Sequence, residues 1–112
     1  MTLFEKIAAR QIPAEIVYET DDLFALRDIN PQAPVHVLII PKRVITRAGD
    51  AQPEDADLLG RLIAASALIA EQLGVRDSGY RLVINSGRNA GETVPHLHVH
   101  LLGGRPLTWP PG

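Results

Sequence analysis

The sequence predicts an α+β domain built on an antiparallel sheet of about five strands, with one short and one long helix. Its 112 residues are enough to bury one hydrophobic core, and the shares of apolar (46 %) and charged (21 %) residues are ordinary for a globular protein. Strand-like runs joined by short connections lie on both sides of one long helical segment. We therefore expect a single domain over residues 1–112.

The first half of the chain predicts a short helix and three strands. Residues 2–10, TLFEKIAAR, place apolar residues at helical spacing, and Pro13 should end that helix. The loop at 30–35 contains two prolines, and the run HVLIIP that follows is apolar and β-branched, which is typical of a central strand. The three strand-like runs lie at 14–20, 22–28 and 36–41.

The second half predicts a long helix and two more strands. The helix should span about 53–74, because Pro53 suits its first position and Gly74 its end. Its apolar residues cover more than one stripe, and we interpret the second apolar face as a possible subunit contact. The two strands lie at 80–86 and 96–102 and are separated by the glycine-bearing loop SGRNAGETV.

Composition excludes several classes of function. The formal charge is −2 and no run of lysines or arginines is present, which argues against binding a nucleic acid polymer. The chain has no cysteine, so disulfides and thiolate–zinc sites are excluded. The longest nearly apolar stretch, LIAASALIA, is too short to cross a membrane, and the first residues do not resemble a secretory signal. We expect a cytoplasmic protein.

Three of the four histidines occur within five residues, in the stretch VPHLHVHLLGG. On a strand, alternate side chains share a face, so His96, His98 and His100 should form one row of imidazoles while the intervening apolar residues enter the core. Three structural histidines would fill a core poorly, and a chance run or tag would lack the interleaved Leu and Val. Metal binding and phosphate chemistry are the two remaining interpretations.

The metal interpretation needs a ligand from outside the row. Two histidines at alternate strand positions can bind zinc if another ligand approaches, and His36 could supply it with help from Asp28 or Glu92. The absence of cysteine and of a second spaced ligand pair argues against such a site.

The phosphate interpretation uses the nucleophilicity of neutral imidazole. With a pKa near 6.5, imidazole is largely unprotonated at neutral pH and can attack phosphorus, while its neighbours orient it and move protons. The loop before the histidines supports this interpretation, because the backbone N–H groups of Gly87 and Gly91 and the hydroxyl of Thr93 could bind an anion.

The segment HLHVHLL at 96–102 fits the pattern His-φ-His-φ-His-φ-φ, where φ is apolar, and on this motif the chain resembles the histidine triad (HIT) family. It is most similar to the nucleoside phosphoramidase (Hint) branch, and the similarity extends over nearly the whole chain, from IPAEIVYET onward and through GYRLVINSGRNAGETV to the final WPPG. The resemblance implies a HIT-like fold, a homodimer whose two sheets join into one, a purine nucleotide substrate, and neither cofactor nor metal.

The resemblance also implies roles for individual residues. His98 would be the nucleophile that forms a nucleotidyl-histidine intermediate, His100 would hydrogen-bond the phosphate and help place or protonate the leaving group, and His96 and His36 would support them. Asp28 and Ile29 would meet the ribose and base. Asn85, Gly91, Glu92 and Thr93 would make further nucleotide contacts. The tail at 103–112, which carries Trp109, would reach toward the partner's site.

Two positions depart from the family pattern. Val44 stands where many relatives have a histidine, and Pro95 stands where an aromatic residue is frequent; both should affect substrate preference and rate. Two rival functions remain: hydrolysis of dinucleoside polyphosphates or nucleotidyl transfer, and a nucleotide-binding interaction module with weak catalysis.

Overall fold

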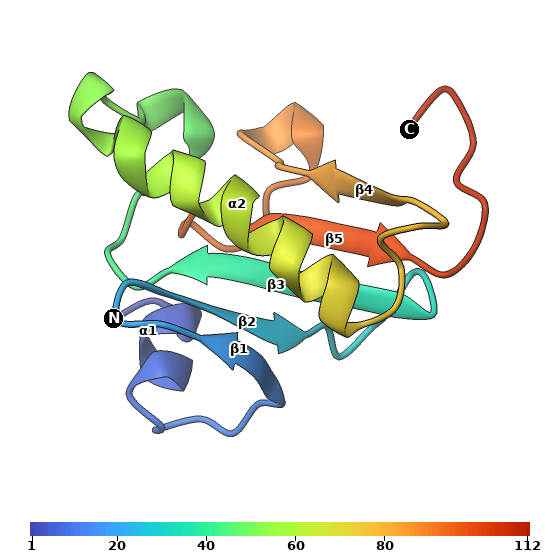
Figure 1. The fold of residues 1–112 in the computed structure, drawn as a ribbon. Helices are drawn as coiled ribbons and strands as arrows, with labels where there is room; N and C mark the ends of the chain where they lie inside the picture. The colour runs from blue at the N-terminus through green and yellow to red at the C-terminus, as the bar shows by residue number, and fades with distance from the viewer.

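The computed structural model describes residues 1–112 and consists of one five-stranded sheet with a helix on each face (Figure 1). The strand order is β1-β2-β3-β5-β4, and every neighbouring pair is antiparallel. The strands are β1 (Ile16–Glu19), β2 (Leu23–Arg27), β3 (Val35–Pro41), β4 (Tyr80–Val83) and β5 (Val99–Gly103). This architecture confirms the predicted α+β class. No helix is long and apolar enough to cross a membrane.

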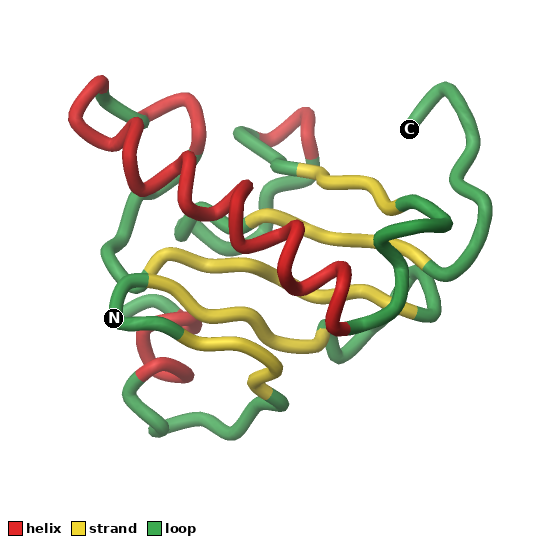
Figure 2. Tube along the Cα trace, viewed as in Figure 1, coloured by secondary structure: helices red, strands yellow, loops and turns green.

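The two helices, α1 (Leu3–Ala8) and α2 (Ala56–Gln72), cover opposite faces of the sheet (Figures 1 and 2). Because side chains alternate between the faces of a strand, each helix packs against its own set of strand residues. On the α2 face, Leu62 and Ile69 belong to a core with Val37, Ile39, Val99 and Leu101. On the α1 face, Phe4 and Ile7 pack with Phe24, Leu26, Leu38 and Ile40.

The short helix α1 is fixed by a reciprocal capping box at its start. The Thr2 hydroxyl accepts a hydrogen bond from Glu5 N at 3.1 Å, and the Glu5 carboxylate accepts one from Thr2 N at 2.8 Å. The helix ends at Ala8, earlier than the predicted stop at Pro13. Two residues further on, Arg10 adopts a φ of 63°, a left-handed conformation that ends the helical path before the proline is reached.

The long helix agrees with the prediction except in its first turn. Residues Pro53–Asp55 form a separate 3₁₀ turn, and the α-helix begins at Ala56. Gly74, with a φ of +76°, follows the end of the helix as predicted. The second apolar face is also present, since Ile63 is 48 % and Leu68 is 52 % exposed.

The prediction that the last strand spans 96–102 is wrong at its start, since β5 begins only at Val99. Pro95 has no N–H, His96 N donates to Val94 O at 2.8 Å, and Leu97 N donates to Ile45 O at 2.6 Å, so these residues are outside the sheet ladder. Strand β4 likewise ends at Val83, before the predicted Ser86.

The register of β3 against β5 positions two histidines. His100 lies opposite Leu38, and His36 lies opposite Leu102. His36 and His100 are therefore diagonal neighbours on the face that α1 partly covers, a relation that brings long side chains into contact.

Candidate active site

His98 presents one free ring nitrogen. Its Nδ1 lies 2.8 Å from the carbonyl oxygen of His96. A carbonyl oxygen only accepts hydrogen bonds, so Nδ1 carries a proton, and in the neutral ring Nε2 has the lone pair. The ring is 9 % exposed and rests against the edge of Phe4, with ring centroids 5.0 Å apart. This is the protonation state that a nitrogen nucleophile needs.

His96 is completely buried and uses both ring nitrogens within the protein. Its Nε2 donates to the carbonyl oxygen of Pro41 at 2.7 Å, so Nδ1 is the acceptor for the Thr2 hydroxyl, also at 2.7 Å. Burial lowers the pKa of His96 below its usual value. A neutral ring with two hydrogen bonds positions the backbone carbonyl to which His98 donates.

His36 and His100 form a directed pair. Gln32 N donates to His36 Nδ1 at 3.0 Å, so the proton of a neutral His36 lies on Nε2, which donates to His100 Nδ1 at 2.9 Å. His100 in turn carries its proton on Nε2. Burial lowers the pKa of His36 and lowers that of His100 to about 4, so both rings are neutral at physiological pH.

The imidazoles of His98, His100 and His36 form a continuous row even though His98 precedes β5, while the His96 ring lies beside Phe4 and contacts Thr2 and Pro41. The ring centroids of His98 and His100 are 5.1 Å apart, and those of His36 and His100 are 5.2 Å apart. Leu97, Val99 and Leu101 alternate with the histidines and are buried in the core on the α2 face, as predicted. The site therefore combines a lone pair on His98 with an N–H on His100.

Asp28 and Ile29 lie at the end of β2, beside His36. Asp28 Oδ2 is 3.4 Å from His36 Nε2, where its charge favours the proton on that nitrogen, and Asp28 Oδ1 accepts a hydrogen bond from Asn30 N at 2.8 Å. The carboxylate thus fixes the local turn and faces the histidine pair. Ile29 is 99 % exposed, an unusual setting for a large apolar side chain.

The glycine loop differs from the expectation. The N–H groups of Gly87 and Gly91 were expected to be free for an anion, and both are occupied: Gly87 N donates to Glu92 Oε1 at 2.9 Å and Gly91 N to Arg88 O at 3.0 Å. The cause is the 3₁₀ turn at Arg88–Ala90, which folds the loop onto itself. In this conformation neither N–H is free, so an anion cradle made of these two groups would require the loop to rearrange.

Glu92 is occupied within the chain as well. Arg47 binds its carboxylate through two nitrogens, at 2.9 Å and 3.0 Å, and this contact is the main cause that lowers the pKa of Glu92. Glu92 therefore joins the glycine loop to the segment after β3. The Glu92 N–H is also used, since it donates to Gly87 O at 3.2 Å, so the carbonyl oxygen and the second lone pair of Oε2 are the acceptors that remain on this residue.

The remaining predicted contact residues lie around the same loop or in the tail. Asn85 follows β4 and is half-buried, while Thr93 and Gly91 are exposed. Trp109 is 81 % exposed and lies in the irregular tail, which Arg81 holds through a hydrogen bond of 3.4 Å to Leu107 O.

One cluster offers three groups that could hold a metal ion: Asp28, His36 and His100, whose ligand atoms lie within 4.8 Å of one another. The 2.9 Å contact between the two histidines is a hydrogen bond with a proton between the nitrogens. Zinc would need a lone pair from each ring, at about 2.0–2.1 Å. In this arrangement the cluster is suited to sharing a proton, and metal binding would require His36 to change tautomer or orientation, because its Nε2 carries that proton.

Sequence reasoning missed three supports of the site: the Thr2 hydroxyl, the Phe4 ring and the Pro41 carbonyl. Phe4 contacts the rings of both His96 and His98, with centroids 5.6 Å and 5.0 Å away. The Thr-x-x-Glu pattern at residues 2–5 is a capping signal that could have placed Thr2 at the start of α1. Nothing in the sequence indicates that this start lies against the histidines.

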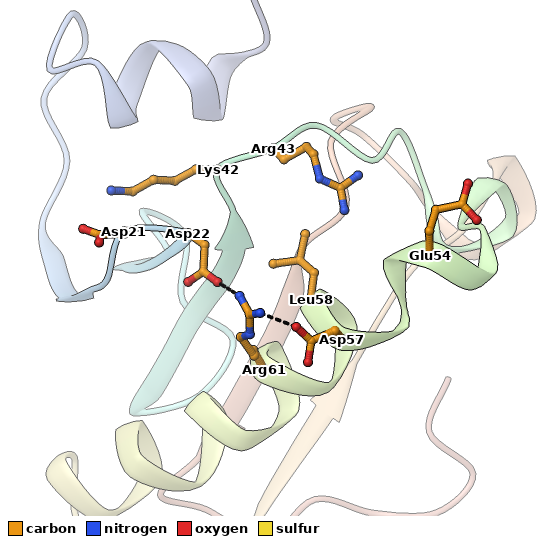
Figure 3. Close-up of a pocket in the computed structure, with 8 residues that line it drawn as sticks. All are labelled: Asp21, Asp22, Lys42, Arg43, Glu54, Asp57, Leu58 and Arg61. Atoms are coloured by element: carbon orange, nitrogen blue, oxygen red, sulfur yellow. Dashed lines mark hydrogen bonds and ion pairs between the residues drawn. The ribbon is translucent and has the colours of Figure 1, made fainter.

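A cavity of about 350 Å³ lies elsewhere, between the β1–β2 turn, the end of β3 and the start of α2 (Figure 3). No histidine lines it. Its cations are already paired: Arg61 with Asp22 and Asp57, Lys42 with Glu19, and Arg43 with Asp55. The lining residues are Asp21, Asp22, Lys42, Arg43, Glu54, Asp57, Leu58 and Arg61. Because the cationic side chains of this cavity are already in ion pairs with its own or neighbouring carboxylates, we do not take it as the active site. The imidazole row remains the candidate site.

Comparison with known proteins shows the family of this chain. The family model of the HIT domain matches residues 9–107. An uncharacterized HIT-like protein of Synechocystis is 55 % identical over 111 residues, which cover 99 % of this chain and 96 % of that protein. The purine nucleoside phosphoramidase of Escherichia coli is 52 % identical over 106 residues, which cover 95 % of this chain and 89 % of that protein.

A solved structure of a HIT family protein has the same fold as this chain. The crystal structure of a HIT family hydrolase from Legionella pneumophila matches with a TM-score of 0.98 at 46 % identity, and the match covers 100 % of both chains. Fold and site together define a small α+β enzyme with a row of imidazole groups in its candidate active site. The chain belongs to the HIT family and is a hydrolase of that family.

Proposed function

We propose that this protein hydrolyses nucleoside phosphoramidates at the α-phosphorus through a nucleotidyl intermediate on His98. The observation that carries the proposal is the hydrogen bond from His98 Nδ1 to the carbonyl of His96, which leaves Nε2 with a lone pair. The identity of 52 % to a purine nucleoside phosphoramidase supports a purine nucleotide as the substrate. No metal or cofactor is required for this chemistry.

The reaction has two displacements. In the first, the lone pair of His98 Nε2 forms a bond to phosphorus, the bond from phosphorus to the amine breaks, and the amine leaves with the electron pair and takes up a proton. In the second, water adds to phosphorus, loses a proton, and the bond to His98 breaks. The products are the free amine and the nucleoside monophosphate.

In this proposal the residues around His98 bind the phosphate, the ribose and the base. The Nε2–H of His100 donates a hydrogen bond to a phosphate oxygen and helps place or protonate the leaving group, and His36 holds the opposite nitrogen of that ring. His96 orients His98. Asp28 and Ile29 meet the ribose and the base, where an exposed isoleucine supplies an apolar surface.

The remaining contacts come from the loop beside the triad. Asn85, Gly91 and Thr93 contact the nucleotide directly. Glu92 contributes through its carbonyl oxygen or the free lone pair of Oε2, because its N–H donates to Gly87 O and the other carboxylate positions are bound by Arg47 and Gly87 N.

We also propose that residues 1–112 act as one HIT domain within a homodimer. The apolar residues Ile63 and Leu68 remain exposed on α2, and Trp109 projects from the tail into solvent. A dimer in which the two sheets join would cover part of this apolar surface and bring the tail at 103–112 toward the partner's site. Analytical ultracentrifugation of the full chain and of a Trp109→Ala variant tests the assembly.

The central test replaces His98 by Ala or Gly. We expect turnover of an adenosine phosphoramidate to fall by at least about a thousandfold, because a positioned nucleophile is worth effective molarities of about 10⁵ M or more. Binding of adenosine monophosphate, measured by calorimetry, should change little. Mass spectrometry of the acid-quenched wild-type enzyme should detect the nucleotidyl adduct on His98.

The same assay separates the rival functions. A panel of adenosine and guanosine phosphoramidates is compared with dinucleoside polyphosphates. Preference for the dinucleotides would replace the proposed substrate class, while nucleotide binding without turnover of any substrate would indicate an interaction module. Normal turnover by His98→Ala would remove the nucleophile from the proposal.

A further inference from the structure

The first residues after β5 hold the loop that precedes β3. Arg105 donates from Nε at 3.1 Å and from Nη2 at 2.9 Å to the carbonyl oxygen of Gln32, and from Nη1 at 3.0 Å to Pro106 O. Gly104, with a φ of +91°, passes so close to Pro34 that a Cβ at this position would lie 2.9 Å from the Pro34 Cβ. The start of the tail therefore fixes this loop at two adjacent points.

The residue that Arg105 binds also determines where His36 carries its proton. Gln32 N donates to His36 Nδ1 at 3.0 Å, so Nδ1 has to be the acceptor. Asp28 acts in the same direction from the other nitrogen, but its carboxylate is 3.4 Å away, a long distance for a hydrogen bond. The Gln32 N–H is thus the closer of the two groups that select the tautomer.

The tautomer of His36 determines which ring nitrogen of His100 carries the proton. With the proton on His36 Nε2, His100 Nδ1 accepts and His100 Nε2 carries an N–H. If His36 moved its proton to Nδ1, its Nε2 would become an acceptor, His100 would protonate Nδ1, and a lone pair on His100 Nε2 would face the phosphate. A lone pair repels a phosphate oxygen, whereas an N–H stabilises it.

We propose that Arg105 is a positioning residue that holds the Gln32 main chain, and thereby keeps the His36–His100 pair in the tautomer that presents an N–H from His100 Nε2. The effect on turnover rests on the proposed phosphoramidase function, whereas the effect on the tautomers does not. The tail thus contributes to the site within its own chain, through a guanidinium that touches neither the histidines nor the substrate.

The test compares Arg105→Met, which removes the guanidinium, with Arg105→Lys, which retains a single donor. Arg76→Met is the matched control, since Arg76 lies just beyond α2 and reaches only Glu71, at 3.8 Å. Nitrogen-15 NMR of the histidine rings in the free protein at neutral pH reports the tautomers directly. We expect the wild type and Arg76→Met to show a proton on Nε2 of both His36 and His100, and Arg105→Met to shift both toward a mixture.

Kinetics give the second readout. Because Arg105→Met loses the hydrogen bonds to the Gln32 carbonyl, its kcat should fall by about three- to tenfold. Its KM for an adenosine phosphoramidate should change by less than about twofold. Arg105→Lys should recover part of kcat, because one donor can still reach the Gln32 carbonyl.

A main-chain variant tests the same link without touching Arg105. Replacing residue 32 by lactic acid turns its amide into an ester and deletes the N–H, and Gln32→Ala is its amide reference. The ester should reproduce the tautomer shift of Arg105→Met, and unchanged ring signals in it would overturn the inference. If Arg105→Met does not fold, the ester tests the link from the Gln32 N–H to His36, and Arg105→Lys tests the link from the guanidinium to the Gln32 carbonyl.

The outcomes separate cleanly. Unchanged ring signals and unchanged kcat in Arg105→Met, with only a lower thermal midpoint, would reduce Arg105 to a structural contact and overturn the inference. A wild-type enzyme that turns over no phosphoramidate would overturn the proposed function, while the ring signals would still decide whether Arg105 sets the tautomers.

Discussion

The Thr2 hydroxyl lies 2.7 Å from Nδ1 of His96, although the two residues are 94 positions apart in the chain. The same hydroxyl accepts the hydrogen bond that caps α1. One oxygen therefore joins the start of the first helix to the buried histidine of the triad, and the helix start becomes a support of the active site.

Replacing Thr2 by Val should destabilise the protein. The change removes the helix cap, worth about 1 kcal/mol, and leaves a buried nitrogen of His96 without a donor, a loss of about 1–3 kcal/mol. We expect the free energy of unfolding, measured in urea, to fall by about 2 kcal/mol or more. Thr2→Ser retains the hydroxyl and should remain close to the wild type; equal losses in both variants would show that the methyl group matters instead.

Breaking the Arg47–Glu92 contact should loosen the glycine loop. Glu92→Ala frees Gly87 N as well as Arg47, so the loop loses its link to the segment after β3. We expect KM for a nucleotide substrate to rise by about threefold or more, with a smaller change in kcat. Arg47→Ala should have a similar effect, and the double variant should be no worse than either single one, because both remove one contact. Additive effects would mean that the two residues act separately.

Stability should decline as the pH falls from about 6.5 toward 4. Burial lowers the pKa of His100 from 6.5 to about 4, and burial also lowers the pKa of His36 and His96. Between these values the unfolded chain binds more protons than the folded one, so acid favours unfolding. Urea titrations at several pH values should show a smaller slope for His100→Gln. An identical slope would mean that His100 does not contribute to this dependence.

Removing metal ions should leave the enzyme active. In the Asp28, His36 and His100 cluster, the histidines share a proton and are not arranged as two lone-pair donors. Extended dialysis against a chelator should therefore change neither kcat nor the thermal midpoint. Loss of activity that zinc restores would favour the metal site that the sequence alone left open.

Several elements could be predicted from the sequence because local signals determine them. Pro53 and Gly74 bound the segment that contains α2, and the β-branched run at 35–41 forms the central strand β3. The alternation of histidines with Leu97, Val99 and Leu101 correctly separates the site from the core. In each of these cases a short stretch of sequence contains the whole signal.

The errors arise where distant contacts decide. His96 was assigned to a strand, yet its ring donates to the Pro41 carbonyl at the end of β3, and β5 starts three residues later. The Gly87 N–H is expected to be free, yet it donates to the carboxylate of Glu92, which Arg47 binds from the segment after β3. The first contact depends on how β3 lies beside the histidines, 55 positions away in the chain, and the second needs Arg47, 45 positions from Glu92, to hold the carboxylate.

The strand order has a consequence for how the chain is made. β5 pairs with both β3 and β4, and it is the last strand to leave the ribosome. Until residues 99–103 are made, one edge of β3 has unpaired N–H and C=O groups and β4 has no neighbouring strand. The sheet of the nascent protein therefore stays incomplete until β5 is made. We expect the nascent protein to avoid aggregation either by binding chaperones or by pairing β5 rapidly with β3 and β4.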